Sequence, residues 1–358
     1  MELKDKYDVV IVGSGPAGAG AAKVISDSGM KALIVEKDKL PRYKMCSGIV
    51  FPSSRKFIDD NFGQLPEEIM CTPKMIKGNR VFFDNESEVM DVPFNAFDPG
   101  DDLETDGFNT WRSELDLWLC KQSDADIVDD CRFDGFEMDG DDYIVGLTHK
   151  GKNVSVKAKY LIGCDGTLSR VRRAAFPGFD EDVIQVPNYE EYYTGDIDLE
   201  PGWLYLFMDR RVTGYFATVF HKNDRIAVVT GVNQKESPKA YFKVFRDHLE
   251  KKHGLVVKET VAKHAIVLQD MNARKNYCMG KGNLLLAGEA GGFLRGGEGI
   301  TSSLISGKAA GDAVLASAKN GKPALDYFKE FSAEEVAMGE KVAKDLEDAL
   351  GFNCFMRP

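Results

Sequence analysis

The chain of 358 residues has no apolar run long enough to form a membrane-spanning helix. Such a helix needs about 18 to 20 consecutive apolar residues. The N-terminal sequence MELKDKYDVV leads directly into an apolar strand and has neither the apolar core nor the cleavage site of a secretory signal. We therefore expect a cytoplasmic protein with no transmembrane segment, for which peripheral contact with a membrane stays open.

Clusters of positive charge are also absent from the sequence. The 46 Lys and Arg residues are scattered, and 57 Asp and Glu residues outnumber them to give a formal net charge of −11. A nucleic-acid-binding surface gathers basic residues on one face, and an anionic membrane attracts polybasic segments. The composition therefore argues against a nucleic-acid partner and against electrostatic anchoring to a membrane.

Cysteine and histidine show no spacing typical of a disulfide framework or a metal site. The number of cysteines, seven, is odd, and no pair has the C-x-x-C spacing. His149, His248, His253 and His264 have no acidic or cysteine partner at ligand spacing. We expect most of the cysteines to be buried thiols, with Cys46 the exception, and we predict no metal site.

Residues 7–36 show a compact strand–helix–strand pattern. Tyr7 to Val12 is nearly all apolar, as expected for a buried parallel strand. Small residues from Gly15 to Ser28 indicate a helix. Ala32 to Val35 predicts a second buried strand, with Glu36 at its end. The pattern predicts an α/β fold that begins with a Rossmann-type βαβ unit.

The middle of the chain is rich in strand patterns. Apolar and aromatic runs over residues 203–208, 214–220 and 225–232 alternate with polar turns, which predicts an inserted antiparallel sheet. Further predicted elements are a helix over 111–120, strands over 143–147, 154–156, 159–164 and 283–287, a helix near 299–318, and helices over 323–350.

The first glycine-rich motif is Gly13-Ser14-Gly15-Pro16-Ala17-Gly18, between the predicted strand and helix. Gly13 would permit the tight turn, Gly15 the close approach of a pyrophosphate, and Gly18 the packing of helix against strand. The helix N-terminus would face the phosphates with free N–H groups. Glu36 stands where an acid accepts hydrogen bonds from a ribose diol. The motif predicts a dinucleotide site but does not by itself distinguish FAD from NAD.

Two further motifs follow predicted strands. Asp165-Gly166 ends one strand, and Ser169 then begins a helix; taken alone, this is explained by an ordinary turn with an N-cap serine. Glu289 follows the strand at 283–287, and the glycines at 296–299 open the next helix. The N-terminus of that helix could stabilise negative charge on a reduced flavin.

In this order the three motifs resemble those of the FAD-dependent reductase and hydroxylase superfamily, over about residues 5–320. The resemblance implies FAD as the cofactor and contact of the later acid with FAD hydroxyls, with Glu289 here in place of the usual Asp. The segment from Arg112 to Asp116 resembles the superfamily's R-x-x-(F/L)-D helix, which implies that Arg112 lies near the cofactor. The implied domains are a discontinuous FAD-binding domain (1–75, 110–180 and 271–322), a substrate domain (76–109 and 181–270) and a C-terminal helical segment (323–358).

Within the superfamily, the chain most resembles the geranylgeranyl reductase group. Cys46-Ser47-Gly48-Ile49 follows the second strand as a Cys-Gly segment does in that group, and Gly297-Glu298-Gly299-Ile300 matches its Gly-Glu-Gly-Ile helix start. Residues 214–222 are similar to its aromatic-x-Trp-x-Phe-Pro-Lys strand, although Ala217 and His221 replace the Trp and Pro. The resemblance implies an FAD-dependent reductase of carbon–carbon double bonds in an apolar, prenyl-like substrate.

The resemblance and the motifs together define the predicted site. The predicted cofactor-binding residues are Gly13, Gly15, Pro16, Ala17, Gly18, Glu36, Lys37, Cys46, Ser47, Gly48, Arg112, Asp165, Gly166, Gly288, Glu289, Gly297, Gly299 and Ile300. The predicted substrate-pocket residues are Tyr215, Ala217, Phe220 and His221.

Reduction of a double bond takes a hydride from reduced flavin and a proton that the protein supplies or relays. Cys46 is the predicted catalytic residue, because a thiol near the flavin can act as a general acid; a buried structural thiol is the alternative. Two other functions stay open: an O2-using FAD-dependent hydroxylase, and a prenyl-binding escort protein without flavin, which the intact Gly13–Gly18 loop disfavours. No second G-x-G-x-x-G stands on a βαβ unit, so the electron donor is either transiently bound NAD(P)H or a small redox protein.

Overall fold

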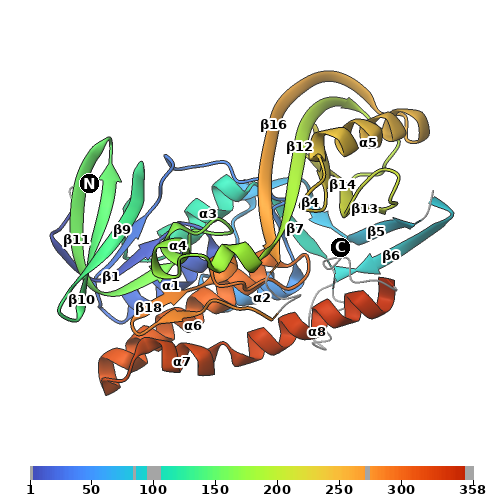
Figure 1. The fold of residues 1–358 in the computed structure, drawn as a ribbon. Coiled ribbons are helices and arrows are strands. Elements are labelled where there is room, and N and C mark those ends of the chain that lie inside the picture. Colours follow the sequence, from blue (N-terminus) through green and yellow to red (C-terminus); the bar gives the residue numbers. More distant parts are fainter. Residues whose placement is uncertain (1–2, 84–85, 95–105, 271–274, 351–358) are drawn as a thin grey trace. The chain divides into compact units, whose positions relative to one another are not determined.

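The computed structural model describes residues 3–83, 86–94, 106–270 and 275–350 (Figure 1). The chain divides into two compact units. Unit 1 comprises residues 1–43, 113–183 and 269–352, and unit 2 comprises residues 44–112, 184–268 and 353–358. Five parts of the predicted domains lie outside the described residues: 1–2, 84–85, 95–105, 271–274 and 351–358.

Unit 1 is built on a largely parallel sheet, as expected for a Rossmann-type domain. The order of its strands is β17 (Gly280–Lys281), β18 (Leu284–Leu286), β11 (Lys152–Gly163), β1 (Lys6–Val12), β2 (Ala32–Val35) and β8 (Asp126–Val128). β10 (Asp142–His149) pairs with β11, and β9 (Cys131–Asp139) pairs with β10, both antiparallel. The predicted strands at 154–156 and 159–164 are one continuous strand, β11.

Helices α1 (Pro16–Asp27) and α6 (Gly299–Asn320) pack closely against each other in unit 1. Small residues make this approach possible: a Cβ added at Gly307 would lie 2.1 Å from the carbonyl oxygen of Ala17. On the other side of the glycine-rich turn, the central residues of β1, Val9, Val10 and Ile11, are fully buried. The turn is therefore fixed by the buried strand β1 that precedes it and by the packed helix α1 that follows it.

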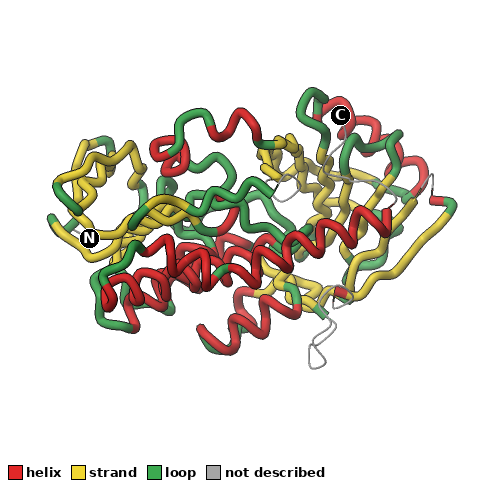
Figure 2. Tube along the Cα trace, turned by 60° about the horizontal axis from the view of Figure 1, so that its bottom comes forward, coloured by secondary structure: helices red, strands yellow, loops and turns green. Residues whose placement is uncertain are grey.

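Unit 1 contains further helices, and Figure 2 draws the helices of the described residues in red. The further helices are α3 (Arg112–Lys121, whose first residue belongs to unit 2), α4 (Arg170–Ala175), α7 (Ala324–Phe331) and α8 (Ala333–Leu350). A buried ion pair between Arg295 and Glu335, at 2.6 Å, joins the loop before α6 to α8. The C-terminal helices, predicted as a separate segment, therefore group with unit 1.

Unit 2 is centred on a seven-stranded sheet. The order of its strands is β16 (Val256–Asp270), β12 (Ile184–Asp196), β15 (Arg225–Gly231), β14 (Phe216–Lys222), β13 (Leu204–Met208), β5 (Gly78–Phe83) and β6 (Glu88–Pro93). β12 with β15, β15 with β14, β14 with β13 and β5 with β6 pair antiparallel, as predicted, whereas β13 and β5 run parallel.

The two faces of this sheet are covered differently. On one face, Phe242, Phe245 and Leu249 of α5 (Pro238–Lys252) pack into an apolar cluster with residues that include Ala217 and Val219. A second apolar cluster contains Phe220, one residue later on the same strand. Because side chains alternate between the faces of a strand, the two clusters lie on opposite faces of the sheet.

A small three-stranded sheet completes unit 2. β7 (Gly107–Thr110) pairs with both β3 (Ile49–Val50) and β4 (Met70–Ile76). α2 (Pro52–Asn61) follows β3. This pairing is why residues 44–75, expected in the FAD-binding domain, group with unit 2 instead.

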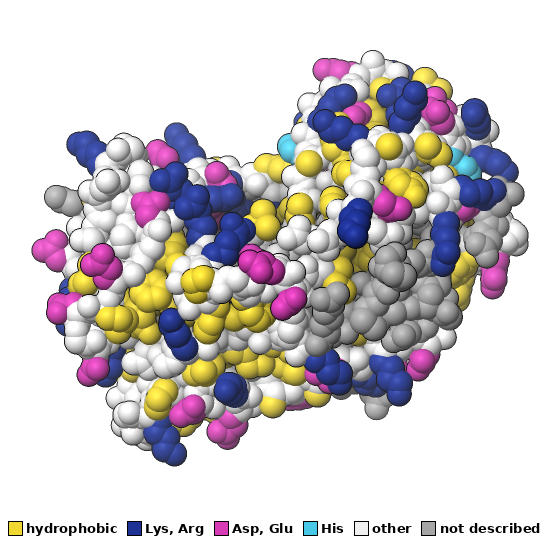
Figure 3. Space-filling model, in the orientation of Figure 1, with side chains coloured by type: hydrophobic (Ala, Val, Ile, Leu, Met, Phe, Trp, Pro, Cys, Tyr) yellow, Lys and Arg dark blue, Asp and Glu magenta, His cyan; other side chains and the backbone are white. Residues whose placement is uncertain are grey.

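Two surface properties bear on the sequence predictions. No helix among the described residues is long and apolar enough to cross a membrane. On the face that Figure 3 shows, basic and acidic side chains of the described residues are interspersed.

Candidate functional site

The first glycine-rich turn has the backbone conformation that its sequence predicts. Gly13 has a φ of +107°, and a Cβ at this position would lie 2.3 Å from the carbonyl oxygen of Cys164. A Cβ at Gly18 would lie 2.0 Å from the carbonyl oxygen of Gly13. Neither position accepts a side chain, because backbone atoms occupy the space. These two glycines form the turn itself.

The N-terminus of α1 has features that suit an anionic ligand. Gly15 is the N-cap residue and makes no side-chain cap, Pro16 is the first helical residue, and the first turn contains no acidic residue. The first N–H groups of a helix lack partners within it, and the helix dipole is positive at this end. The turn and helix therefore fit the pyrophosphate of a dinucleotide.

Glu36 lies at the end of β2, buried beside the glycine-rich turn. Its Oε2 accepts hydrogen bonds from the Ser14 backbone N–H at 3.2 Å and the Ser14 hydroxyl at 2.7 Å. Arg42 donates to the same oxygen at 3.0 Å. Burial raises the pKa of Glu36, but Arg42 and Ser14 outweigh burial, so this pKa is lowered overall. The carboxylate next to the turn is therefore ionised, while the adjacent Lys37 is exposed.

Asp165 of the second motif caps α4. Its Oδ2 accepts hydrogen bonds from the backbone N–H groups of Arg170 at 2.6 Å and Val171 at 3.2 Å. Ser169 is the N-cap residue and accepts a hydrogen bond from the N–H of Arg172 at 2.9 Å. The simple explanation of this motif, a turn with an N-cap serine, thus describes its local structure. Contact of Asp165 with a cofactor stays a prediction.

The third motif brings Glu289 against the second. Thr167 donates a hydrogen bond to Glu289 Oε2 at 2.8 Å. Cβ atoms added at Gly166 and Gly299 would each lie 3.8 Å from a carboxylate oxygen of Glu289. Gly288 has a φ of +60° and lies against Ala17 of α1. A Cβ added at Gly288 would lie 2.9 Å from the Cβ of Ala17.

The three glycine-rich motifs therefore meet in unit 1, although they lie far apart in the sequence. A Cβ at Gly13 would lie 3.1 Å from Cα of Asp165, which links the first motif to the second. Nothing lies within 4 Å of a Cβ added at Gly297, which is exposed, and Ile300 is buried in the first turn of α6. Two helix starts, small residues, the buried Glu36 and the half-buried Glu289 meet here, which fits an extended ligand that carries phosphates and hydroxyls.

The predicted catalytic segment lies in unit 2. Cys46 is half-buried, and its Sγ accepts a hydrogen bond from the N–H of Gly48 at 3.4 Å. The carbonyl oxygen of Gly48 accepts hydrogen bonds from the Thr110 hydroxyl at 2.7 Å and the Thr110 N–H at 3.0 Å. Gly48 has a φ of +64°, and its added Cβ would lie 2.1 Å from the Thr110 carbonyl oxygen, so glycine is required there.

A fully buried lysine, which the sequence predictions omitted, lies against this segment. Lys222 Nζ donates hydrogen bonds to the Thr110 carbonyl oxygen and, at 3.1 Å, to Asn109 Oδ1. A Cβ at Gly48 would lie 3.0 Å from the same nitrogen. Burial lowers the pKa of Lys222 to about 8, although interactions with the thiols of Cys71 and Cys46 oppose this shift.

The signal for Lys222 was present in its strand. Lys222 ends β14 two residues after the buried Phe220, so both side chains belong to the same face. A lysine in phase with buried residues is a candidate for burial, and a buried lysine has a shifted pKa. Nothing in the sequence indicates its partners Asn109 and Thr110, more than 110 residues away.

The four predicted substrate-pocket residues do not share one face of the sheet. Ala217 belongs to the cluster under α5, whereas Phe220 belongs to the cluster on the opposite face. Tyr215 precedes β14 and contacts Phe216 edge-on, and burial lowers the pKa of His221. Alternation along β14 explains the separation, so no single pocket is lined by all four through this strand.

The predicted site residues are thus divided between the two units. Arg112, buried at the start of α3, belongs to unit 2, as do Cys46, Ser47, Gly48 and the four predicted pocket residues. The remaining predicted cofactor-binding residues belong to unit 1.

Comparison with known protein families identifies the family of the chain. The chain belongs to the FAD binding domain family, whose family model matches residues 6–291. The cofactor of the chain is therefore FAD, as predicted, and the residues that meet in unit 1 fit it. Gly13, Gly18, Glu36, Gly288 and Glu289 all lie within the matched region.

Two named relatives indicate the class of oxidoreductase to which the chain is similar. The chain is 25% identical over 382 residues to the digeranylgeranylglycerophospholipid reductase of Methanosarcina acetivorans, covering 99% of this chain and 86% of the relative. It is 26% identical over 341 residues to the geranylgeranyl diphosphate reductase of Rhodobacter capsulatus, covering 89% of this chain and 78% of the relative. The predicted resemblance, an FAD-dependent oxidoreductase similar to the geranylgeranyl reductases, is confirmed.

Solved structures confirm the predicted fold. A geranylgeranyl bacteriochlorophyll reductase-like protein from Thermoplasma acidophilum has a TM-score of 0.73 and 18% identity, covering 98% of this chain and 84% of the other. The myxobacterial chondrochloren halogenase has a TM-score of 0.76 and 16% identity, covering 99% and 84%. Because the same fold carries different reactions, these likenesses concern the fold alone.

Proposed function

We propose that the chain is an FAD-dependent reductase that adds hydrogen across carbon–carbon double bonds of an apolar, prenyl-like substrate. The observation that carries this proposal is the position of the buried Lys222 beside the Cys46–Gly48 segment. Reduction of a double bond needs a proton in addition to a hydride, so a reductase needs a proton source at its site.

The residues of the chain have distinct roles in this proposal. Bound and reduced, FAD supplies the hydride. Cys46 donates a proton to the second carbon of the double bond, and its thiolate is then reprotonated. Lys222 is suited to this last step, because its pKa of about 8 lets it hold or release a proton near neutral pH. In unit 1, Glu36 and Glu289 hold hydroxyl groups of the cofactor.

An apolar substrate is supported by the surroundings of Lys222 and by the relatives. Lys222 Nζ lies 4.9 Å from the ring centroid of Trp111 and 6.0 Å from that of Phe220. The two named relatives are reductases of digeranylgeranylglycerophospholipid and of geranylgeranyl diphosphate by their names. The electron donor in this proposal is NAD(P)H bound transiently or a small redox protein.

The test uses the FAD-loaded protein, reduced with dithionite in the absence of O2. Geranylgeranyl diphosphate should restore the absorbance of oxidised flavin and yield a product with two added hydrogens for each reduced double bond, measured by mass spectrometry. The saturated analogue is the control and should leave the flavin reduced. Failure of both prenyl diphosphates and prenyl glycerophospholipids to oxidise the flavin contradicts the proposal.

Two other outcomes separate the alternatives. Reoxidation that requires O2 and yields a hydroxylated product assigns the chain to the hydroxylases. A protein that purifies without yellow colour and binds no added FAD, but retains a prenyl ligand, is an escort protein.

A further inference from the structure

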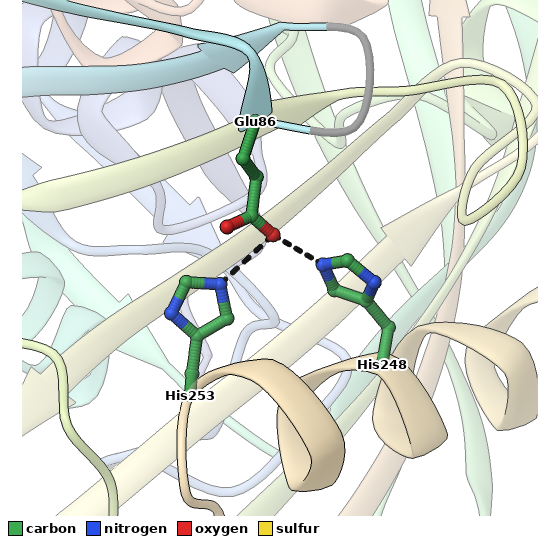
Figure 4. A group of neighbouring side chains, drawn as sticks. All are labelled: Glu86, His248 and His253. Carbon is green, nitrogen blue, oxygen red and sulfur yellow. Dashed lines mark hydrogen bonds and ion pairs between the residues drawn. The ribbon is translucent and has the colours of Figure 1, made fainter.

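Glu86, His248 and His253 converge in unit 2 (Figure 4). Glu86 lies between β5 and β6, His248 lies in α5, and His253 is the C-cap residue of α5. His253 Nε2 lies 3.0 Å from Glu86 Oε1, and His248 Nε2 contacts the same oxygen. One ligand atom from each residue lies within 4.8 Å of the other two.

We propose that these three side chains bind a divalent metal ion, for which Zn2+ is the representative. Two imidazole nitrogens and one carboxylate form a ligand set that zinc uses in proteins. Zinc lies about 2.0–2.2 Å from such ligands, so tetrahedral ligand atoms are about 3.3 Å apart. Glu86 Oε1 already lies 3.0 Å from His253 Nε2 and in contact with His248 Nε2. The ligand atoms of the two rings, which lie within 4.8 Å of each other, would approach by at most about 1.5 Å.

The surrounding side chains hold the three ligands in place. The ring of Phe207 lies edge-on to His248 at 6.2 Å and to His253 at 5.5 Å, measured between ring centroids. The ring of Phe82 lies edge-on to His253, also at 5.5 Å. The side chains of Glu86, His248 and His253 are only 17%, 15% and 10% exposed. A ligand set that is already ordered loses little conformational entropy when it binds an ion.

A hollow of about 570 Å3 in unit 2 includes His253 in its lining. Its charged lining consists of three carboxylates, Asp91, Asp198 and Glu200, and one basic residue, Arg80, which pairs with Asp91 at 2.6 Å. Acidic side chains favour the approach of a cation. Three protein ligands leave a fourth tetrahedral position for water or for a small ligand.

The cluster is separate from the proposed catalytic residues. Its two histidines belong to α5, which covers the face of the sheet that contains Ala217. Lys222 belongs to the opposite face, in phase with Phe220. A metal ion bound here therefore connects the β5–β6 segment to α5 and stabilises unit 2, without contact with the Cys46–Gly48 segment. Since 162 residues separate Glu86 from His248, ligand spacing in the sequence predicted no metal site.

The test measures Zn2+ binding by the FAD-loaded protein after treatment with a chelator and its removal. The wild type should bind one equivalent per chain with a Kd below about 1 µM, and Co2+ should give the intense visible absorption of tetrahedral coordination. Glu86→Gln and His248→Gln should each weaken Zn2+ binding at least 10-fold. His149→Gln changes a histidine of β10 in unit 1 and is the matched control, which should bind as the wild type does.

Flavin absorbance and thermal denaturation show whether each variant is folded. Two variants are used, so that a folding defect in one does not decide the result. The proposal is overturned if the wild type binds less than one equivalent at micromolar Zn2+. It is equally overturned if folded Glu86→Gln or His248→Gln protein binds within twofold of the wild type.

Discussion

Arg42 Nε lies 3.0 Å from Glu36 Oε2, directly beside the glycine-rich turn of unit 1. The same guanidinium reaches Asp116, with Nη1 3.0 Å from Oδ2. The acid that the sequence predicted as a ribose ligand is therefore already part of a buried ion-pair network. This network keeps Glu36 ionised and fixes its side chain before any cofactor arrives, which favours binding of the cofactor.

Glu36→Gln should weaken FAD binding while the protein stays folded. The substitution removes the charge but keeps the size, and Arg42 retains Asp116 as a partner. A buried hydroxyl of the cofactor that loses its charged acceptor costs about 1–3 kcal/mol, so the Kd for FAD should rise by roughly 5-fold to 150-fold. Quenching of flavin fluorescence during titration of the apoprotein measures this. Asp139→Asn, at an exposed carboxylate of unit 1, is the control; equal affinities of the wild type and Glu36→Gln would remove Glu36 from the site.

Substitutions at Gly15 and Gly18 should have different effects. Gly15 has φ −79° and ψ −176°, which any residue adopts, so Gly15→Val should keep the fold and abolish FAD binding by filling the space for the pyrophosphate. Gly18→Ala places a Cβ 2.0 Å from the Gly13 carbonyl oxygen, so it should destabilise the protein itself, by about 1–3 kcal/mol or more. Flavin content and urea denaturation distinguish the two effects. A folded Gly15→Val protein with full flavin content contradicts the assignment of the turn.

The sequence predicted unit 1 better than unit 2, and the reason is physical. β1, α1 and β2 were predicted to within one or two residues, because buried parallel strands are continuously apolar and a glycine-rich turn has a local signature. The meeting of Glu289 with Thr167 depends on which strand ends lie side by side, and the order of parallel strands follows from the fold rather than from local sequence.

The polar interior of unit 2 was not predictable in the same way. β12 buries both Glu190 and Glu191, so its pattern of charge does not mark the exposed face. The metal-ligand cluster and the partners of Lys222 depend on contacts between residues more than 100 positions apart. The division of Ala217 and Phe220 between two faces, by contrast, follows from the two-residue period of a strand, and the sequence contained that information.

Lys222→Met should remove a rise in stability at alkaline pH. The pKa of Lys222 is about 8 in the folded protein, below its ordinary value of 10.5. Between these values the unfolded chain binds more protons than the folded chain, so the free energy of unfolding contributed by Lys222 rises with pH. The full increase in the free energy of unfolding is roughly 3 kcal/mol. Urea denaturation at several pH values from 8 to 10.5 should show the wild type gaining stability relative to Lys222→Met.

The exposed Lys258 of unit 2 provides the control for this measurement. Lys258→Met removes a lysine whose side chain is 65% exposed, and it is measured over the same pH range. Parallel stability curves for the wild type and Lys222→Met would contradict the burial of a titrating Lys222.

Cys46→Ser should keep FAD bound and slow the reaction. The glycine-rich turns and the acids that fit FAD belong to unit 1, whereas Cys46 belongs to unit 2. A serine hydroxyl is a far weaker acid than a thiol, and general acid catalysis typically contributes about 10²–10⁴-fold to a rate. Flavin reoxidation by a prenyl substrate in the absence of O2 should slow by a factor in this range. Cys71→Ala removes the other thiol whose charge interacts with Lys222, and it is expected to leave the rate within a few-fold of the wild type. If Cys46→Ser oxidises its flavin as fast as the wild type does, Cys46 is not the proton donor, and Lys222 becomes the residue to test in its place.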